Sequence, residues 1–204
     1  DTGPDFRFQM LREQVQDLDA VVFTHGHKDH VAGLDDIRPF NYLLEKTIDV
    51  YAEESVQEVL KNEFSYAFRP HDYPGAPQIR LNTIDETPFE IGDIDFIPIR
   101  VMHKTLPVLG FRIGDFTYIT DANFIAEEEL EKIKGSKVLV LNALRKEAHY
   151  SHFNLEQAID IVEKVKPERA YFTHISHHLG LYEKTEKELP SNIFLAYDGL
   201  TISI

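Results

Sequence analysis

The stretch His25-Gly26-His27-Lys28-Asp29-His30 places three imidazoles and one carboxylate within six consecutive positions. The preceding run Ala20-Val21-Val22-Phe23-Thr24 is apolar and β-branched, which is typical of a buried strand. Because residues i and i+2 of an extended chain share a face, the first two histidines can bind one ion. The aspartate and the last histidine follow where the chain turns toward a helix, and they can face a second ion. The stretch therefore predicts two adjacent metal ions beyond the end of a strand.

Each of these side chains, taken alone, has an ordinary alternative as a surface histidine or as a polar residue at a helix entry. For the four side chains together, metal ligation is the stronger interpretation, because their spacing matches that of metal ligands.

Composition limits the classes of protein to which the chain can belong. With 204 residues, 43% of them hydrophobic, it can bury a full core as one domain over 1–204 or as an α/β sandwich of two similar halves. It contains no membrane-spanning apolar run and no signal peptide, so we expect a soluble, cytoplasmic protein without a membrane partner. The absence of cysteine excludes disulfides, thiolate ligands and a cysteine nucleophile.

The net charge of −14 opposes binding to nucleic acid, which requires a basic footprint. A small anionic substrate remains compatible with this charge, because metal ions can supply positive charge locally.

Periodicity and turn residues predict a mainly helical region before residue 79. The expected elements are an amphipathic helix within 5–15, a short helix over 31–37 ended by Pro39, a helix over about 56–64 capped by Ser55 and Glu58, and a loop over 69–77.

Strands dominate the second part of the chain. They are expected at 79–81, 89–91, 94–102, 110–113, 117–120, 138–141, 170–173, 194–196 and 201–202. Gly92-Asp93 and Gly114-Asp115 favour hairpin turns. Asn154 and Gln157 predict a capping box for a helix that runs through about 165 and stops at Pro167.

Three more side chains with metal-binding chemistry directly follow predicted strands. His103 comes after the strand that ends at 102, Asp121 after the strand that ends at 120, and His174 after the strand that ends at 173. Ligands converge at such positions in open α/β sheets, because rigid strands end together around a shared crevice. Considered alone, His103 or Asp121 would be an ordinary polar residue at a strand end. Their shared placement favours a site instead.

The HxHxDH motif, followed by an isolated histidine, an aspartate and a late histidine, resembles the metallo-β-lactamase superfamily over nearly the whole chain. The resemblance implies a four-layer αββα sandwich with a dinuclear site. It implies that one metal is bound by His25, His27 and His103, the other by Asp29, His30 and His174, and that Asp121 bridges them. Zinc suits the histidine-rich first site, and manganese stays open because Asp29 and Asp121 add oxygen ligands.

Branches of the superfamily differ at positions that this sequence shows. Without cysteine, the chain lacks the ligand that true β-lactamases use on the second metal. The di-iron, oxygen-reducing branch has glutamate where this chain has His27. The resemblance therefore points to the hydrolases.

Segments 1–7 (DTGPDFR), 151–155 (SHFNL) and 172–177 (FTHISH) more closely resemble the phosphoribosyl cyclic phosphate phosphodiesterases of phosphonate breakdown, which are related to tRNA 3′-processing endonucleases. This resemblance implies that His152 is a general acid acting on the leaving oxygen, and Asp29 is assigned to catalysis with it. The chemistry alone does not separate His152 from His149. Arg145 is a candidate contact for substrate phosphate, although a solvated arginine is the more ordinary interpretation. Members of these groups usually begin with two or more further strands, so we expect the chain shown to lack them.

The sequence thus predicts a two-metal phosphodiesterase that acts on a small or cyclic phosphodiester. One alternative is a thioesterase resembling glyoxalase II, although no glutathione-binding segment is identifiable. Another is a metal-binding protein whose hydrolytic site has decayed, which the complete set of seven candidate ligands opposes. RNA processing is disfavoured by the acidic charge and the lack of a basic arm. The exact substrate and the oligomeric state, including a homodimer, stay open.

Overall fold

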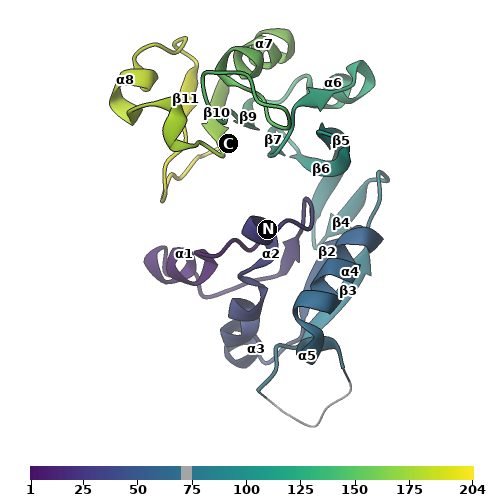
Figure 1. The fold of residues 1–204 in the computed structure, drawn as a ribbon. Helices are drawn as coiled ribbons and strands as arrows, with labels where there is room; N and C mark the ends of the chain where they lie inside the picture. Colours follow the sequence, from purple (N-terminus) through teal and green to yellow (C-terminus); the bar gives the residue numbers. More distant parts are fainter. Residues whose placement is uncertain (70–74) are drawn as a thin grey trace. The chain divides into compact units, whose positions relative to one another are not determined.

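The computed structural model describes residues 1–69 and 75–204, which form two compact units (Figure 1). The first unit comprises Asp1–Asp85 and the second comprises Glu86–Ile204. Each unit has its own cluster of buried apolar side chains. Among the helices of the described residues, none has the length and apolar character that crossing a membrane requires. A single domain over the whole chain stays a prediction.

The first unit is built on a three-stranded parallel sheet in the order β1-β2-β3. Parallel strands need covered faces, and α4 packs against β3 (Figure 1). Buried side chains such as Phe23, Leu34, Ile48 and Leu60 form its core. The strands are β1 (Ala20–Val22), β2 (Ile48–Ala52) and β3 (Ile79–Thr83), and the helices are α1 (Phe6–Arg12), α2 (Lys28–Val31), the 3-10 helix η1 (Leu34–Ile37), α3 (Arg38–Leu44), α4 (Glu54–Glu63) and α5 (Ser65–Phe68).

Two predicted helix boundaries in this unit are wrong. Pro39 does not end a helix but lies in the first turn of α3, where proline is tolerated because its missing N–H has no intrahelical partner there. The N-cap of α4 is Glu53, so Ser55 lies inside the helix and forms no capping box with Glu58. Gln57 Nε2 instead donates to the Ala52 carbonyl, 3.1 Å away, and thereby ties the start of the helix to the end of β2.

Other predictions for this region have mixed outcomes. The helix within 5–15 is confirmed as α1, and the strand before the histidine motif as β1. The predicted 31–37 helix is divided between the end of α2 and η1. The loop predicted over 69–77 falls mostly on residues 70–74, outside the described residues.

The second unit is built on an eight-stranded mixed sheet in the order β11-β10-β9-β7-β6-β5-β4, with β8 paired to β5. Helix α6 packs against β5, α7 against β9, and α8 against β11 (Figure 1). The strands are β4 (Phe89–Ile91), β5 (Ile94–His103), β6 (Leu106–Ile113), β7 (Phe116–Ile119), β8 (Phe124–Ile125), β9 (Val138–Asn142), β10 (Arg169–Thr173) and β11 (Ile193–Leu195), and the helices are α6 (Glu127–Ile133), α7 (Leu155–Val165), the 3-10 helix η2 (His177–Leu179) and α8 (Tyr182–Glu186).

Strand direction in this sheet brings several strand ends to one edge. Strands β5 and β7 are each antiparallel to β6, so they run the same way. Strands β9, β10 and β11 continue in that direction, because each adjacent pair from β7 to β11 is parallel. The outgoing ends of β5, β7 and β10 therefore lie at the same edge, as the strand-end argument predicted.

Most predictions for the second unit are confirmed. The turns at Gly92 and Gly114 join antiparallel strands, and both glycines have positive φ, +63° and +56°. The capping box at the start of α7 is present. Strand β6 begins at Leu106 rather than at 110. The strand predicted at 201–202 is wrong, because these residues pair with no neighbouring strand.

Candidate metal centre

In the first unit, the histidine motif folds into one cluster beyond the end of β1. His27 is the N-cap of α2, whose first turn carries Asp29. The ring centroid of His25 lies 4.7 Å from that of His27 and 4.2 Å from that of His30. His30 Nε2 is 3.5 Å from Asp29 Oδ2. His25 and His30 are buried, whereas His27 and Asp29 are exposed, so the cluster has a buried and an open side.

Asp1 orients two of these histidines through hydrogen bonds. The Thr24 hydroxyl donates to Asp1 Oδ2, at 2.8 Å, and lies 3.0 Å from His25 Nδ1. Because that hydroxyl has one proton and gives it to the carboxylate, His25 Nδ1–H must be the donor to Thr24. His30 Nδ1 lies 2.9 Å from Asp1 Oδ2 and donates to it. Both rings thus keep the lone pair on Nε2, the arrangement that supporting carboxylates give to metal-binding histidines.

Backbone contacts hold Asp1 in this place. Thr2 N–H donates to the His30 carbonyl at 2.8 Å, and Gly33 N–H donates to the Thr2 carbonyl at 2.8 Å. A side chain at Gly33 would not fit, because its Cβ would lie 2.3 Å from the Gly3 carbonyl oxygen. The sequence prediction missed this role, although Asp1 opens the DTGPDFR segment that carried the resemblance. A carboxylate in a segment that resembles a family motif was the available signal.

In the second unit, the predicted ligands gather at the edge where β5, β7 and β10 end. His103 is the last residue of β5, and His174 directly follows β10. Asp121 Oδ1 lies 3.0 Å from His152 Nε2 and 3.3 Å from His174 Nε2. Ligand atoms of His103, Asp121 and His152 all lie within 4.8 Å of one another. His103 Nδ1 donates to the Ser151 carbonyl at 2.8 Å, which leaves Nε2 as the nitrogen that could hold a metal.

Two of these residues, Asp121 and His174, have a strained backbone conformation. Asp121 has φ +57° and His174 has φ +54°, in the left-handed region that costs a non-glycine residue about 1–3 kcal/mol. Asn142, which is fully buried, holds the chain beside Asp121: its Oδ1 accepts from Ala122 N–H at 2.7 Å and its Nδ2 donates to the Ala122 carbonyl at 2.9 Å. Such strain is typical of functional sites. The sequence prediction did not find this role of Asn142.

The loop that carries His152 is fixed at its end. Phe153 N–H donates to the Ala122 carbonyl at 2.7 Å, and Leu144 N–H donates to the Phe153 carbonyl at 3.0 Å. Arg145 Nη2 donates to the Ala148 carbonyl at 2.7 Å, so its guanidinium stabilises the loop that contains it. Its predicted role as a substrate contact stays a prediction.

The donors present suit divalent metals. Imidazole nitrogens and carboxylate oxygens are ligands for both zinc and manganese. In His25, His30 and His103, hydrogen bonds at Nδ1 leave the lone pair on Nε2, the nitrogen that would then hold a metal. Within the second unit, His103, Asp121 and His152 form a group whose ligand atoms lie close enough together to hold a metal ion.

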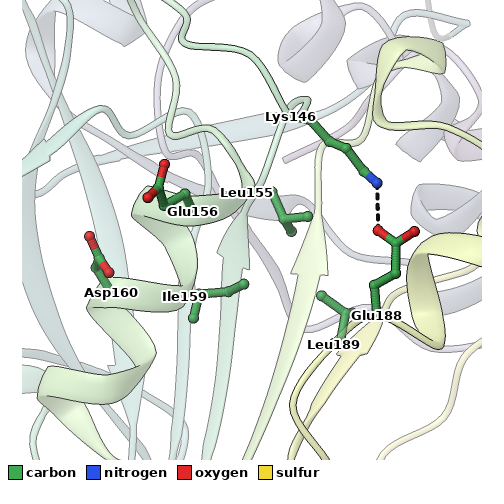
Figure 2. A pocket seen from close by; sticks show the side chains of 7 residues that line it. All are labelled: Lys146, Leu155, Glu156, Ile159, Asp160, Glu188 and Leu189. Carbon is green, nitrogen blue, oxygen red and sulfur yellow. Dashed lines mark hydrogen bonds and ion pairs between the residues drawn. The ribbon is translucent and has the colours of Figure 1, made fainter.

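Two pockets of the second unit differ in whether a candidate metal ligand lines them. A pocket of about 320 Å³ lies beside α7, where the Lys146–Glu188 ion pair spans 2.5 Å (Figure 2). Its seven lining residues include no candidate ligand. A second pocket, of about 300 Å³, adjoins His174 and Tyr197 at the outgoing ends of β10 and β11. The second pocket therefore offers room next to a candidate ligand.

The α/β fold and the histidine and aspartate clusters define the metallo-β-lactamase class of proteins. The family model for the beta-lactamase superfamily domain matches residues 1–175, and the chain belongs to this superfamily. Its members are generally metal-dependent hydrolases.

Within this class, two similar proteins differ in their names. The chain is 39% identical to the crystal structure of a new diphosphatase from the PhnP family, with a TM-score of 0.92. The match covers all of this chain and 78% of that one. It is 40% identical over 202 residues to a protein of Porphyromonas gingivalis named octanoyltransferase. That match covers 98% of this chain but only 41% of the relative.

More distant structures share the fold. Human tRNase Z, short form, is 18% identical with a TM-score of 0.72, and the match covers all of this chain and 86% of that one. Zinc-bound PqqB from Methylobacterium extorquens is 19% identical with a TM-score of 0.77, over all of this chain and 82% of that one. At these identities the likeness shows the fold alone.

Proposed function

We propose that the chain is a dinuclear metal-dependent phosphodiesterase that acts on a small or cyclic phosphodiester. The observation that carries the proposal is the placement of His152, whose Nε2 lies 3.0 Å from Asp121, the proposed bridging ligand. A proton donor beside a carboxylate that would hold metal suits a reaction that expels an alkoxide. The similarity to a protein named diphosphatase supports chemistry at phosphorus.

The proposed ligands are the seven side chains that the resemblance implies. They are His25, His27 and His103 for one ion, Asp29, His30 and His174 for the other, and Asp121 for both. When bound, two divalent ions such as zinc or manganese supply positive charge against phosphate oxygens and lower the pKa of water near them.

The remaining steps belong to the side chains of this protein. His152 donates its Nε2 proton to the departing oxygen. Asp29, exposed beside His30, takes part by accepting a proton from the attacking water. The loop that carries His152 leads into the N-terminus of α7, where partial positive charge favours an anionic group.

The test is turnover of bis(p-nitrophenyl) phosphate by the metal-loaded protein. We expect turnover that chelation abolishes and that added zinc or manganese restores. The His25→Ala/Asp121→Ala double variant should be inactive, and His178→Ala, at an exposed histidine of η2, should match the parent. Full activity of the double variant would contradict the proposal. Two equivalents of bound metal without turnover on any ester would favour the decayed, metal-binding alternative.

One observation favours a second candidate, an ester or thioester hydrolase. The relative from Porphyromonas gingivalis is named for acyl transfer, although this chain spans only 41% of its length. Rates on an acyl thioester and on a phosphodiester, measured with one preparation, separate the two candidates. A faster thioester reaction with the same metal dependence would replace the phosphodiesterase proposal.

A further inference from the structure

The His152 ring is held at both of its nitrogens. Its Nε2 lies 3.0 Å from Asp121 Oδ1, and its Nδ1 lies 3.1 Å from His149 Nδ1. The two ring centroids are 5.0 Å apart, with an interplanar angle of 45°. His149 therefore contacts the edge of His152 that is opposite the proposed metal ligand.

The loop itself holds His149 in place. Arg145 Nε and Nη2 donate to the carbonyls of Glu147 and Ala148, at 3.3 Å and 2.7 Å, and so form a bend just before His149. Ser151 N–H donates to His149 Nδ1 at 3.4 Å. The Tyr150 ring lies 4.4 Å from the His149 ring, centroid to centroid, at 33°. These contacts direct His149 Nδ1 toward His152.

Ring orientation matters for an imidazole that must deliver a proton from one nitrogen. The terminal torsion of histidine is broad and roughly two-fold, so rotation exchanges the positions of the two ring edges at little cost. A hydrogen-bonding partner on the far side removes this freedom. The Ser151 hydroxyl also lies 3.1 Å from His152 Nδ1, so Ser151 and His149 both restrict rotation of the His152 ring.

We propose that His149 is a positioning residue that keeps the His152 ring turned with Nε2 toward the departing oxygen. The proposal rests on the proposed function, in which His152 is the general acid. It also separates the two histidines that chemistry alone left open: His152 faces Asp121, whereas the hydrogen bonds of His149 in the described structure go to Ser151 and His152.

Dependence on the leaving group provides the test. p-Nitrophenoxide departs with little need of a proton, whereas the opening of 2′,3′-cyclic adenosine monophosphate expels an alkoxide that needs one. His152→Ala should lower kcat on the cyclic ester by roughly 10²- to 10⁴-fold. His149→Phe should lower kcat on the cyclic ester by about 10- to 100-fold and on bis(p-nitrophenyl) phosphate by less than about 3-fold, because only the delivery of the proton is impaired.

Two further variants separate positioning from general damage. His149→Asn should regain most of the lost kcat, because its side-chain amide can occupy the place of Nδ1. The His149→Phe/His152→Ala double variant should be no slower than His152→Ala, since His149 acts through His152. His178→Phe, at an exposed histidine of the same unit, is the matched control and should be unchanged on both substrates.

A second readout needs neither metal nor turnover. In the metal-free protein, the ring resonances of His152 should form one narrow set in the parent and in His149→Asn. They should broaden or double in His149→Phe. A single unchanged set in His149→Phe would overturn the positioning role, even in a protein that hydrolyses neither substrate.

The outcomes distinguish a failure of the proposed general acid, His152, from a failure of the positioning role of His149. If His152→Ala shows no leaving-group dependence, the general acid of the proposed function is wrong. If His152→Ala shows it but His149→Phe slows both substrates alike or neither, only the role of His149 is overturned. A greater loss in His149→Phe than in His152→Ala would make His149 the acid and would also overturn the inference.

Discussion

Asp1 accepts hydrogen bonds from the Thr24 side chain and from His30, so one carboxylate orients two histidines of the motif. We expect Asp1→Ala to weaken metal binding by about 10- to 100-fold, because supporting partners of metal ligands typically have effects of this size. Competition with a chromogenic chelator measures the change. Asp5→Ala is the matched control, since Asp5 is the N-cap of α1 and its side chain makes no capping hydrogen bond. Equal affinities in the parent and Asp1→Ala would contradict the role of Asp1.

His149 should also respond to pH in a defined direction. Burial, then repulsion by His152, Arg145 and His103, lowers the pKa of His149 below its ordinary value of 6.5. The folded state therefore favours neutral His149, and the unfolded chain binds more protons at this position. The corresponding stability is present above pH 6.5 and is lost as pH falls through the lowered pKa.

We therefore expect the NMR titration midpoint of the His149 ring in the folded protein to lie below 6.5. The free energy of unfolding, measured in urea at pH 7 and pH 5, should fall less between the two pH values in His149→Phe than in the parent. A midpoint at or above 6.5 would show that the neighbouring charges do not act as described.

At the scale of elements, the start of α7 is the best-defined helix end in the second unit. Asn154 Oδ1 accepts from Gln157 N–H at 2.9 Å, and Gln157 Oε1 accepts from Asn154 N–H at 3.1 Å. Asn154→Ala should therefore reduce the free energy of unfolding by about 1–2 kcal/mol. Urea denaturation measures this loss. Glu163→Ala, at an exposed position of the same helix, should change stability by less than about 0.5 kcal/mol, and equal losses in both variants would contradict the capping role.

The contrast between α7 and α4 shows which elements a sequence reveals. The capping box of α7 is encoded by residues 154 and 157, and it was predictable because both partners lie in one turn. The start of α4 was not, because Gln57 forms its bonds with Ala52 and with Thr83 of a separate strand. Local signals identify an element, whereas contacts between elements decide where it begins.

The same distinction applies to the candidate centre. The placement of His103 at the end of β5 and of His174 directly after β10 was predictable, because both strands are recognisable in the sequence and run in the same direction. The supporting groups were not predictable in this way. Asp1 acts on His30, 29 positions away, and Asn142 holds the backbone at 122, 20 positions away. Neither distance along the chain leaves a periodic signal in the sequence.

At the scale of the whole molecule, the net charge of −14 sets the electrostatic field that an approaching anion meets. A small phosphodiester requires favourable charge only at the metal ions, whereas a long nucleic acid also requires cations along its backbone. Although the fold is shared with human tRNase Z, short form, an identity of 18% carries no inference about RNA. From the acidic net charge we propose that nucleic acid is not the substrate.

Salt dependence of tRNA binding tests this exclusion. A protein that makes six to ten phosphate contacts loses roughly 10³- to 10⁵-fold in affinity between 50 and 200 mM salt, because each neutralised phosphate releases counterions. This chain should bind fluorescently labelled tRNA weakly, and its affinity should change by less than about 10-fold over that range, since its acidic surface releases few counterions. Fluorescence anisotropy at both salt concentrations measures the slope, with a tRNase Z as the positive control. Tight binding with a steep slope would require a local basic surface strong enough to overcome the net charge, and would restore RNA as a substrate class.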